Sequence, residues 1–540
     1  MLPPPPIRGL YRTDPRARAA YAEGAGIYRI VPEAVCVPAD RQDVVSLIGW
    51  AAGHRVPLVP RGAGSAMGGG NVGEGVMVDL TRLERRLEIL PAERLARTSA
   101  NITLGELNAA ADEYDLRLPP DPSSGRWATA GGVVSTNAAG ARSVRYGSVR
   151  RWVRAIELVT PAGELLVLRR GGGSGDGSVE TARRFEAELA PALRGAASLI
   201  AARFPRTRKN SSGYALDVWL ASGDLLDLVV GAEGTLGLVV GVEWALDPIP
   251  AHRAALRVEL RSLDDLVKAV AALHGAEPSA IELLDRTFLE LVSRTVEGEG
   301  LADAEAILLV ELERFDAAEL TQAVDAAAEA VRPIAASVET ALSPTSAARL
   351  WALRHAASPI LAGLPEHRRS LQVVEDGCVP VERTGDYIRA VRQAAASRGI
   401  AAVMFGHAGD GHVHVNLLPE IQRQGWEAAV ADLLEEVTSA LVRLGGTPAG
   451  EHGDGRLRAG LLGRIYGEEV VALFRRLKQL FDPLGILAPG VILPAGEPAI
   501  GRLKVGADAA PLPDDIARAL REIERGGGYG RSRLELADTR

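Results

Sequence analysis

A glycine-rich loop between two short strands restricts the folds open to this 540-residue chain. The run VPLVPRGAGSAMGGG (56–70) predicts a β-strand followed by a loop whose successive N–H groups can surround an anion. It is not the Rossmann fingerprint, because Met67 stands where the third glycine belongs and a strand, VMVDL (76–80), follows instead of a helix. A plain surface turn is the alternative interpretation of this loop taken alone.

Two further segments favour a ligand over a plain turn. The segment DPSSGRWATAGGVVSTNAAGARSVRYGSVR (121–150) is rich in small residues and polar groups, and GAEGTLGLVV (231–240) adds another glycine-rich approach. Three such loops in one β-rich region indicate a large flat or phosphate-bearing ligand packed against backbone.

The pattern of strands and helices changes near Pro250. Residues 30–250 contain short β-rich runs, including a predicted hairpin (155–168) and the strand LVVGVEWAL (238–246), and this predicts one cofactor domain. Residues 251–469 alternate strands with helices, the first helix opening at Ser262, which predicts an antiparallel sheet covered by helices. The expected fold class is α+β. We expect the remaining segments to be an N-terminal piece (1–29), a C-terminal helix that returns to the cofactor domain (470–496), and a helix with a loose tail (497–540).

Composition excludes several classes of protein. The net charge of −8 comes from 69 acidic and 61 basic residues spread along the chain, so nucleic acid is not an expected partner. Cys36 and Cys378 form no C-x-x-C pair, which excludes a disulfide framework or an iron–sulfur cluster held by this chain. No signal-peptide core or long apolar run is visible. We expect a cytoplasmic protein without a transmembrane segment, and peripheral binding at the inner face of the membrane remains compatible with this.

Histidines and carboxylates gather in two motifs, FGHAGDGHVHVN (405–416) and GEHGDG (450–455). Neutral imidazole and carboxylate are ligands for a borderline divalent cation, and three protein ligands leave an open position for catalysis. Spacing alone favours the pair His412 and His414, which share one face of a strand. The pair His407 and His414 requires a bend at residues 409–411, and hydrogen-bonded structural histidines are a third interpretation. A further segment, WALRH (351–355), is by itself a helix with an exposed arginine.

The glycine-rich segments, in this order, resemble the FAD-binding domain of the vanillyl-alcohol oxidase and para-cresol methylhydroxylase flavoprotein family. The likeness covers about 220 residues through PRGAGSAMGGG, TSANITLGELNAAADEYDLRLPPDPSS, ATAGGVVSTNAAGARSVRYG and GAEGTLG. It implies a two-part FAD-binding domain. Many members attach the flavin covalently to a histidine in the first loop, where this chain has Ser65 and Ala66, so non-covalent FAD is expected. The residues that the resemblance assigns to the cofactor are Pro60, Arg61, Gly62, Ala63, Gly64, Ser65, Ala66, Met67, Pro119, Asp121, Pro122, Ser123, Ala130, Gly131, Gly132, Ser135, Asn137, Gly140, Tyr146, Glu233 and Gly234.

The histidine motifs resemble the D-lactate, glycolate and D-2-hydroxyglutarate dehydrogenase branch of that family, in which the position of His412 is commonly Asn. This resemblance implies a metal held by His407, His414 and Glu451. It also implies His452 as general base, Asn416 near the substrate and Arg354 at the substrate carboxylate. This chain has His355 where the branch usually has Glu after the arginine.

The expected function is FAD-dependent oxidation of a small D-2-hydroxy acid to the 2-oxo acid. A hydride passes to flavin N5, assisted by a divalent metal (Zn, Mn or Fe) and a His base. The expected electron acceptor is a quinone, a cytochrome, an electron-transfer flavoprotein or a separate iron–sulfur protein, and a homodimer is compatible with this function. The alternatives are a flavin oxidase of an alcohol or sugar lactone, a His/His/Glu metal-dependent hydrolase, and a non-catalytic flavin-binding subunit.

Overall fold

The first glycine-rich loop leaves the end of a strand in a small mixed sheet. The computed structural model describes residues 3–175, 177–292 and 304–538. In this sheet the strand order is β1 (Leu10–Arg12), β2 (Ala34–Val37), β4 (Val76–Asp79) and β3 (Leu58–Arg61). Strands β2, β4 and β3 are parallel, and α2 (Arg41–His54) supplies the crossover that parallel neighbours need. Because β1 pairs with β2, the predicted N-terminal piece is part of this sheet.

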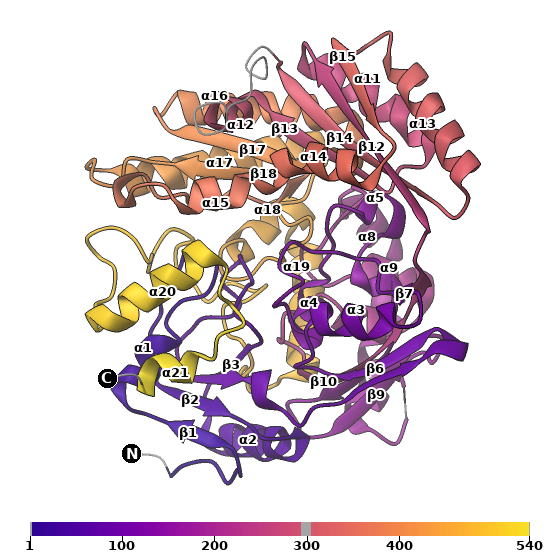
Figure 1. The fold of residues 1–540 in the computed structure, drawn as a ribbon. Helices are drawn as coiled ribbons and strands as arrows, with labels where there is room; N and C mark the ends of the chain where they lie inside the picture. The colour runs from indigo at the N-terminus through magenta and orange to yellow at the C-terminus, as the bar shows by residue number, and fades with distance from the viewer. Residues whose placement is uncertain (1–2, 176, 293–303, 539–540) are drawn as a thin grey trace.

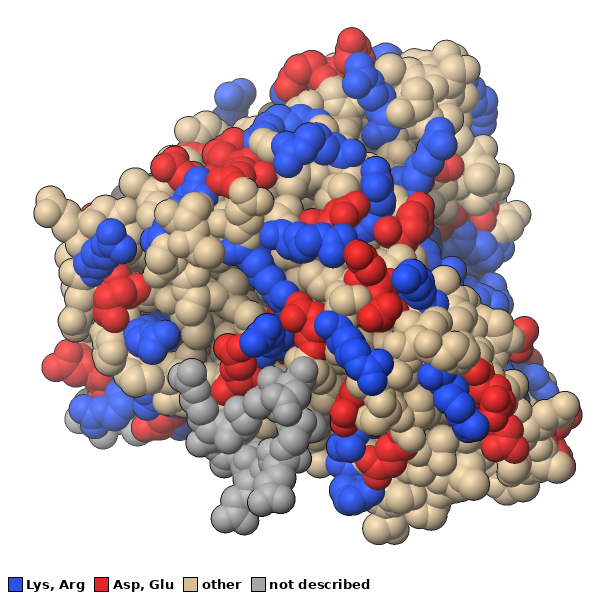
Figure 2. Space-filling model, turned by 90° about the horizontal axis from the view of Figure 1, so that it is seen from above, with Lys and Arg blue, Asp and Glu red and all other residues tan. Residues whose placement is uncertain are grey.

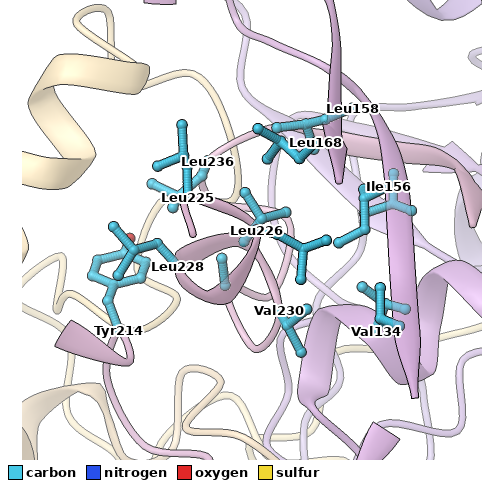
Figure 3. Close-up of a cluster of buried hydrophobic side chains, with 14 of the residues drawn as sticks. Val134, Ile156, Leu158, Leu168, Tyr214, Leu225, Leu226, Leu228, Val230 and Leu236 are labelled. Atoms are coloured by element: carbon cyan, nitrogen blue, oxygen red, sulfur yellow. The ribbon is translucent and has the colours of Figure 1, made fainter. Parts of the chain in front are cut away.

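A second, antiparallel sheet completes the first domain (Figure 1). Its strand order is β5 (Leu87–Leu90), β6 (Leu95–Ser99), β10 (Leu238–Ala245), β8 (Val153–Val159) and β9 (Leu165–Arg169). The predicted hairpin is confirmed as β8 and β9, which turn at Gly163 with a φ of 79°. Figure 3 shows apolar side chains of this domain's core, where Val134 of α4 (Ala130–Thr136) belongs to one cluster with Ile156 and Leu226. This core holds the second and third glycine-rich loops in place.

The second domain is built on one antiparallel sheet, as predicted. Its strand order is β15 (Ser337–Ala341), β12 (His252–Leu260), β14 (Ala306–Arg314), β13 (Ala280–Asp285), β17 (Ala401–His407), β18 (His412–Leu418) and β16 (Gly377–Cys378). Alternate residues face opposite sides, so Leu256 and Leu308 pack with one set of helices, whereas Ala255 and Ile307 pack with another. The first set is α11 (Leu263–Leu273), α13 (Ala317–Val331), α16 (Thr384–Ala396) and α17 (Trp426–Leu444). The second set is α12 (Arg286–Val292), α14 (Pro344–His355) and α15 (Ala357–Ala362).

In the view from above (Figure 2), basic and acidic side chains are interspersed among uncharged residues, and neither sign forms one continuous patch on this face. This agrees with the mixed charge pattern of the sequence. Among the described residues, no helix combines the length and the apolar character required to cross a membrane.

A buried ion pair joins the two domains. Arg117, in β7 (Leu116–Arg117), donates from both terminal nitrogens to the carboxylate of Glu313 on β14, at 3.0 and 2.8 Å. The Tyr146 hydroxyl donates to the same carboxylate at 2.9 Å. Tyr146, expected near the cofactor, therefore lies at the domain interface.

Replacing Glu313 by glutamine should lower the free energy of unfolding by about 3 kcal/mol at pH 7, because a buried guanidinium then loses its counter-charge. Burial raises the pKa of Glu313, but Arg117 and Arg142 outweigh it and lower the pKa from 4.5 to about 2. Because the pKa of Glu313 is lower in the folded state, its ionised carboxylate stabilises the fold at pH values above about 4.5. This contribution disappears as the pH falls from about 4.5 to about 2. Denaturant unfolding across this range measures the effect.

The matched control is Glu436→Gln, since Glu436 is 46% exposed and its pair with Arg398 is a surface contact. We expect a change below about 1 kcal/mol for this control. Equal stability of Glu313→Gln and the parent at pH 7 would contradict the interface role.

The end of the chain returns to the first domain, and its last described part, where a helix with a loose tail was expected, contains that helix and a second one. Helix α19 (Glu468–Phe481) packs into the first core, and the Leu58 amide donates to the Ile486 carbonyl at 2.8 Å. Beyond it, α20 (Asp514–Gly526) and α21 (Arg533–Asp538) pack against α1 (Pro15–Ala20). The reason is the spacing of Ile516, Leu520 and Ile523, which gives α20 one apolar face.

Candidate active site

One cavity of about 1140 Å³ lies between the domains and is lined by the glycine-rich loops and by the histidine motifs. Cavities for drug-sized ligands have volumes of about 300–1000 Å³, so this one has room for a larger cofactor and a small molecule together. The segments predicted to bind cofactor and metal thus meet at one place.

The residues expected at the cofactor divide into two groups. The larger group lines the cavity: Pro60, Arg61, Gly62, Ala63, Gly64, Ser65, Ala66, Met67, Asp121, Pro122, Ser123, Gly131, Gly132, Ser135, Gly140, Glu233 and Gly234. The cavity wall does not include Pro119, Ala130, Asn137 or Tyr146. Ala130 is a core residue, and Asn137 ends α4 in the left-handed conformation, with its side-chain oxygen accepting from the Arg150 amide. These two residues support the loops from behind.

Close backbone packing explains two of the glycines. A Cβ at Gly62 would lie 2.3 Å from Oγ1 of Thr129, and one at Gly140 would lie 2.4 Å from the carbonyl oxygen of Asp121. Both distances are far inside van der Waals contact. A larger residue at position 62 would therefore push the first loop away from the second, and one at position 140 would distort the second loop itself; both loops line the cavity.

Glu233 connects the third loop to the second histidine motif. Its carboxylate accepts from the backbone amides of Asp454 at 2.7 Å and Gly455 at 3.0 Å. Burial and the neighbouring Asp454 raise the pKa of Glu233 to about 8. This residue holds the GEHGDG loop against the first domain.

Three possible ligand atoms converge beside β17 and β18 of the second domain's sheet. The bend at residues 408–411 places His407 at the end of β17 opposite β18. His407 Nε2 lies 3.3 Å from His414 Nε2 and 3.1 Å from Glu451 Oε1, and His414 Nε2 lies 3.5 Å from the same Oε1. A tetrahedral zinc site with bonds of about 2.0–2.1 Å has ligand separations of about 3.3 Å. The three separations fit a small divalent cation.

Neighbouring groups orient both imidazoles. His407 Nδ1 lies 2.5 Å from a carboxylate oxygen of Glu282, and His414 Nδ1 lies 3.1 Å from the Glu375 carbonyl. Each Nδ1 then carries the proton and each Nε2 presents its lone pair, which is the usual arrangement around metal-binding histidines. Burial raises the pKa of Glu282, but His407 and Arg354 outweigh it and lower the pKa to about 2. Glu282 is therefore a permanent negative charge behind the cluster.

His412, the ligand favoured by spacing alone, has other partners. Its Nε2 lies 2.8 Å from the carboxylate of Asp376, and its Nδ1 lies 3.4 Å from the ammonium of Lys209. The same ammonium donates to Glu451 Oε2 at 2.8 Å. His412 belongs to the wider His/Glu cluster, but both of its nitrogens point to these groups. The geometry favours His407 over His412 as the partner of His414.

His452 combines an oriented imidazole with contact to the cavity. Its Nδ1 lies 2.7 Å from the Glu375 carboxylate, and its ring stacks on His414 with centroids 5.2 Å apart. Its Nε2 lies 3.7 Å from Glu451 Oε1. Burial lowers the pKa of His452, but Glu375 and Asp376 outweigh it and raise the pKa to about 10. At this pKa the imidazole is protonated at neutral pH, and the Glu375 carboxylate fixes its orientation.

Arg354 and Asn416 also line the cavity. Arg354 Nε donates to Glu282 at 2.8 Å, and its guanidinium lies 4.5 Å from the centre of the Phe405 ring. Glu282 thus supports the arginine, whereas the side chain of His355 lies outside the described residues. Asn416 Oδ1 accepts a hydrogen bond from the Ser370 hydroxyl at 3.1 Å. This contact fixes the side-chain amide, whose nitrogen then points away from Ser370 as a hydrogen-bond donor.

Sequence reasoning missed Glu282, Glu375, Asp376 and Lys209, which surround the histidines. One signal was available, since Glu282 interrupts the apolar run AIELLD, and a carboxylate in a buried strand needs a partner. Asp376 is fully buried in the same way. The partners themselves come from distant segments, so no local pattern identifies them.

The fold and the cavity are those of an FAD-binding oxidoreductase with a separate second domain. Residues 32–169 match the family described as FAD binding domain, and residues 249–492 match FAD linked oxidases, C-terminal domain. The chain is 30% identical over 464 residues to D-lactate dehydrogenase of Archaeoglobus fulgidus, covering 85% of this chain and 91% of the relative. It therefore belongs to the FAD-linked oxidase family, which confirms the resemblance seen in the sequence.

Two further relatives and one solved structure are also similar to this chain. Glycolate oxidase subunit GlcD of Bacillus subtilis is 29% identical, covering 86% of this chain and 89% of the relative. D-2-hydroxyglutarate dehydrogenase of Pseudomonas putida is 31% identical, covering 96% of this chain, and this chain spans 53% of that protein. Among solved structures, 4-ethylphenol oxidase from Gulosibacter chungangensis superposes with a TM-score of 0.63 at 16% identity, over 90% of this chain and 94% of the other. At that identity the likeness concerns the fold.

Proposed function

We propose that this protein oxidises a small D-2-hydroxy acid to the corresponding 2-oxo acid, using non-covalent FAD and a divalent cation held by His407, His414 and Glu451. The observation that carries the proposal is the triangle of two Nε2 atoms and one Oε1, with sides of 3.1–3.5 Å, in the wall of the cavity that the glycine-rich loops line. The names of the relatives, which act on lactate, glycolate and 2-hydroxyglutarate, support this substrate class.

The side chains around the triangle have complementary tasks. The planar guanidinium of Arg354 suits a two-point contact with the substrate carboxylate, and Glu282 fixes its orientation. His452 accepts the hydroxyl proton on Nε2, because its Nδ1 is held by Glu375. Asn416 offers its amide N–H groups to a substrate oxygen. Together these groups fix a 2-hydroxy acid at three points, which selects one enantiomer.

Two bound groups would supply what side chains cannot. A divalent cation (Zn, Mn or Fe) would lower the pKa of a coordinated hydroxyl, and FAD would accept a hydride at N5. The cation's charge beside Glu451 would also oppose protonation of His452 and lower its pKa from the high value that Glu375 and Asp376 impose. The first loop offers Ser65 and Ala66 in place of a histidine, which supports dissociable FAD. The electron acceptor in this proposal is a quinone, a cytochrome, an electron-transfer flavoprotein or a separate iron–sulfur protein.

Anaerobic mixing with a panel of D- and L-2-hydroxy acids tests the proposal through the flavin absorbance. We expect bleaching by a D-acid, with loss of the response after chelation of the cation. Peroxide release in air would instead favour an oxidase of alcohols or sugar lactones, and a colourless purified protein would favour a metal-dependent hydrolase. A yellow protein that no substrate bleaches, even with added metal, would indicate a non-catalytic flavin-binding subunit.

A further inference from the structure

The C-terminal segment 497–538 lies beyond residue 492, where the match to the C-terminal family domain ends, yet it forms part of the cavity wall. Figure 1 shows α20 between α1 of the first domain and α15 of the second. The residues of this segment that line the cavity are Arg521, Glu524, Arg525, Gly526, Gly527 and Tyr529. The segment is therefore placed to act on whatever fills the cavity.

Ion pairs fasten this segment to both domains. On the first domain, Arg16 pairs with Asp515 at 2.5 Å. On the second domain, Glu366 accepts from Arg521 at 2.7 Å and from Arg525 at 2.9 Å. The segment therefore bridges the two domains beside the cavity.

An aromatic contact packs the segment against the second glycine-rich loop. The Tyr529 ring meets the Trp127 ring edge-on, with centroids 6.3 Å apart, and both side chains line the cavity. A Cβ at Gly527 would lie 2.7 Å from the Trp127 ring, so this glycine permits the close approach. The cavity wall is continuous from the loop to the C-terminal segment.

Two buried guanidinium groups lie near the first loop: Arg61 lines the cavity, whereas Arg533 lies 5.7 Å from the ring centre of Tyr529, which lines it. Arg61 is 2% exposed and donates to the carbonyl oxygens of Glu23 and Asn71. Arg533 is 4% exposed, and within the described residues its Nε and Nη1 have no hydrogen-bond partner. Burial and the charge of Arg61 lower the pKa of Arg533 to about 10. A buried positive charge with unsatisfied donors is costly, and a nearby anion relieves that cost.

We propose that the segment 497–538 is part of the cofactor site. It closes the cavity over the first two glycine-rich loops, and Arg533 acts with Arg61 to provide the positive field that attracts the pyrophosphate of FAD. The inference rests on the FAD-binding domain and is independent of which substrate is oxidised.

Arg533→Gln tests the charge, with Arg531→Gln as the matched control, because Arg531 is 46% exposed on the same segment. In the full chain stripped of flavin, we expect Arg533→Gln to weaken FAD binding by about tenfold to a hundredfold. Riboflavin, which lacks the pyrophosphate, should bind as tightly as it binds to the parent. The melting temperature of the flavin-free variant should equal or exceed that of the parent, since an unpaired buried charge is removed. The control should match the parent in all three measurements.

Unchanged FAD affinity of Arg533→Gln would overturn the proposal. An equal loss of FAD and riboflavin binding together with a lower melting temperature would also overturn it, because that result describes a structural role. The closure is tested separately by Tyr529→Ala, which removes part of the wall without changing charge. Faster release of FAD from the diluted holoprotein, followed by flavin fluorescence, is expected, and an unchanged release rate would disprove the closure.

Discussion

Replacing His452 by alanine should leave the FAD content unchanged and slow substrate-driven flavin reduction by about a thousandfold, since a positioned general base contributes about 10²–10⁴ in rate. FAD content should be unchanged because the side-chain partners of His452 are Glu375, Asp376 and Glu451, none of which belongs to the glycine-rich loops. Stopped-flow absorbance under anaerobic conditions measures the reduction rate. Partial recovery of the rate by added imidazole would identify the lost group as a base.

The control for this experiment is His54→Ala. His54 ends α2, and its Nδ1 contacts the Trp50 carbonyl at 2.8 Å, away from the cavity-lining residues. We expect this variant to be reduced at the parent rate. If His452→Ala were also reduced at the parent rate, His452 would have no part in the mechanism.

If the proposed cation is bound, replacing His407 by alanine should remove it and lower turnover by at least about a thousandfold, because such a cation would orient the substrate and stabilise charge that develops during the reaction. The loss of one imidazole also leaves Glu282 without the partner that lies 2.5 Å from it. FAD should remain bound, so the purified variant stays yellow. Elemental analysis of the metal and the rate of flavin reduction provide two independent measurements.

The matched variant is His412→Asn, which changes the neighbouring histidine whose nitrogens face Asp376 and Lys209. It should retain the cation and most of the activity. The opposite pattern, with metal lost from His412→Asn and kept in His407→Ala, would assign the ligand pair to His412 and His414.

Much of the architecture could be predicted because it depends on neighbours along the chain. Met67 and the strand after it exclude a Rossmann turn, and the alternation of residues in β12 and β14 predicts a sheet with helices on its faces. The second glycine-rich loop was predicted from its many small residues. The structure gives the reason for one of them, since Gly140 has no room for a side chain. Family likeness in the sequence then indicated FAD binding, which the domain matches confirm.

The C-terminal tail was predicted only in part. A helix was expected and is present as α20, but the glycines at 526–528 suggested a loose end, whereas α21 follows them, and α20 presents Ile516, Leu520 and Ile523 to α1. An apolar face three to four residues apart predicts a helix, but the sequence does not say which surface it covers. That surface turned out to be formed by the first residues of the chain.

The sequence by itself determined the class of fold, the FAD-binding loops and the set of histidines available near Glu451, because these depend on residue type and short spacing. The tertiary structure decided which imidazole nitrogens face one another. Glu282 on β13 contacts Nδ1 of His407 and so turns Nε2 toward His414, whereas the carboxylate of Asp376 contacts Nε2 of His412. It also decided that the C-terminal helices line the cavity. The physical reason is that these contacts join residues 125 positions apart (Glu282 and His407) and 36 positions apart (Asp376 and His412), and only the folded chain brings such residues together.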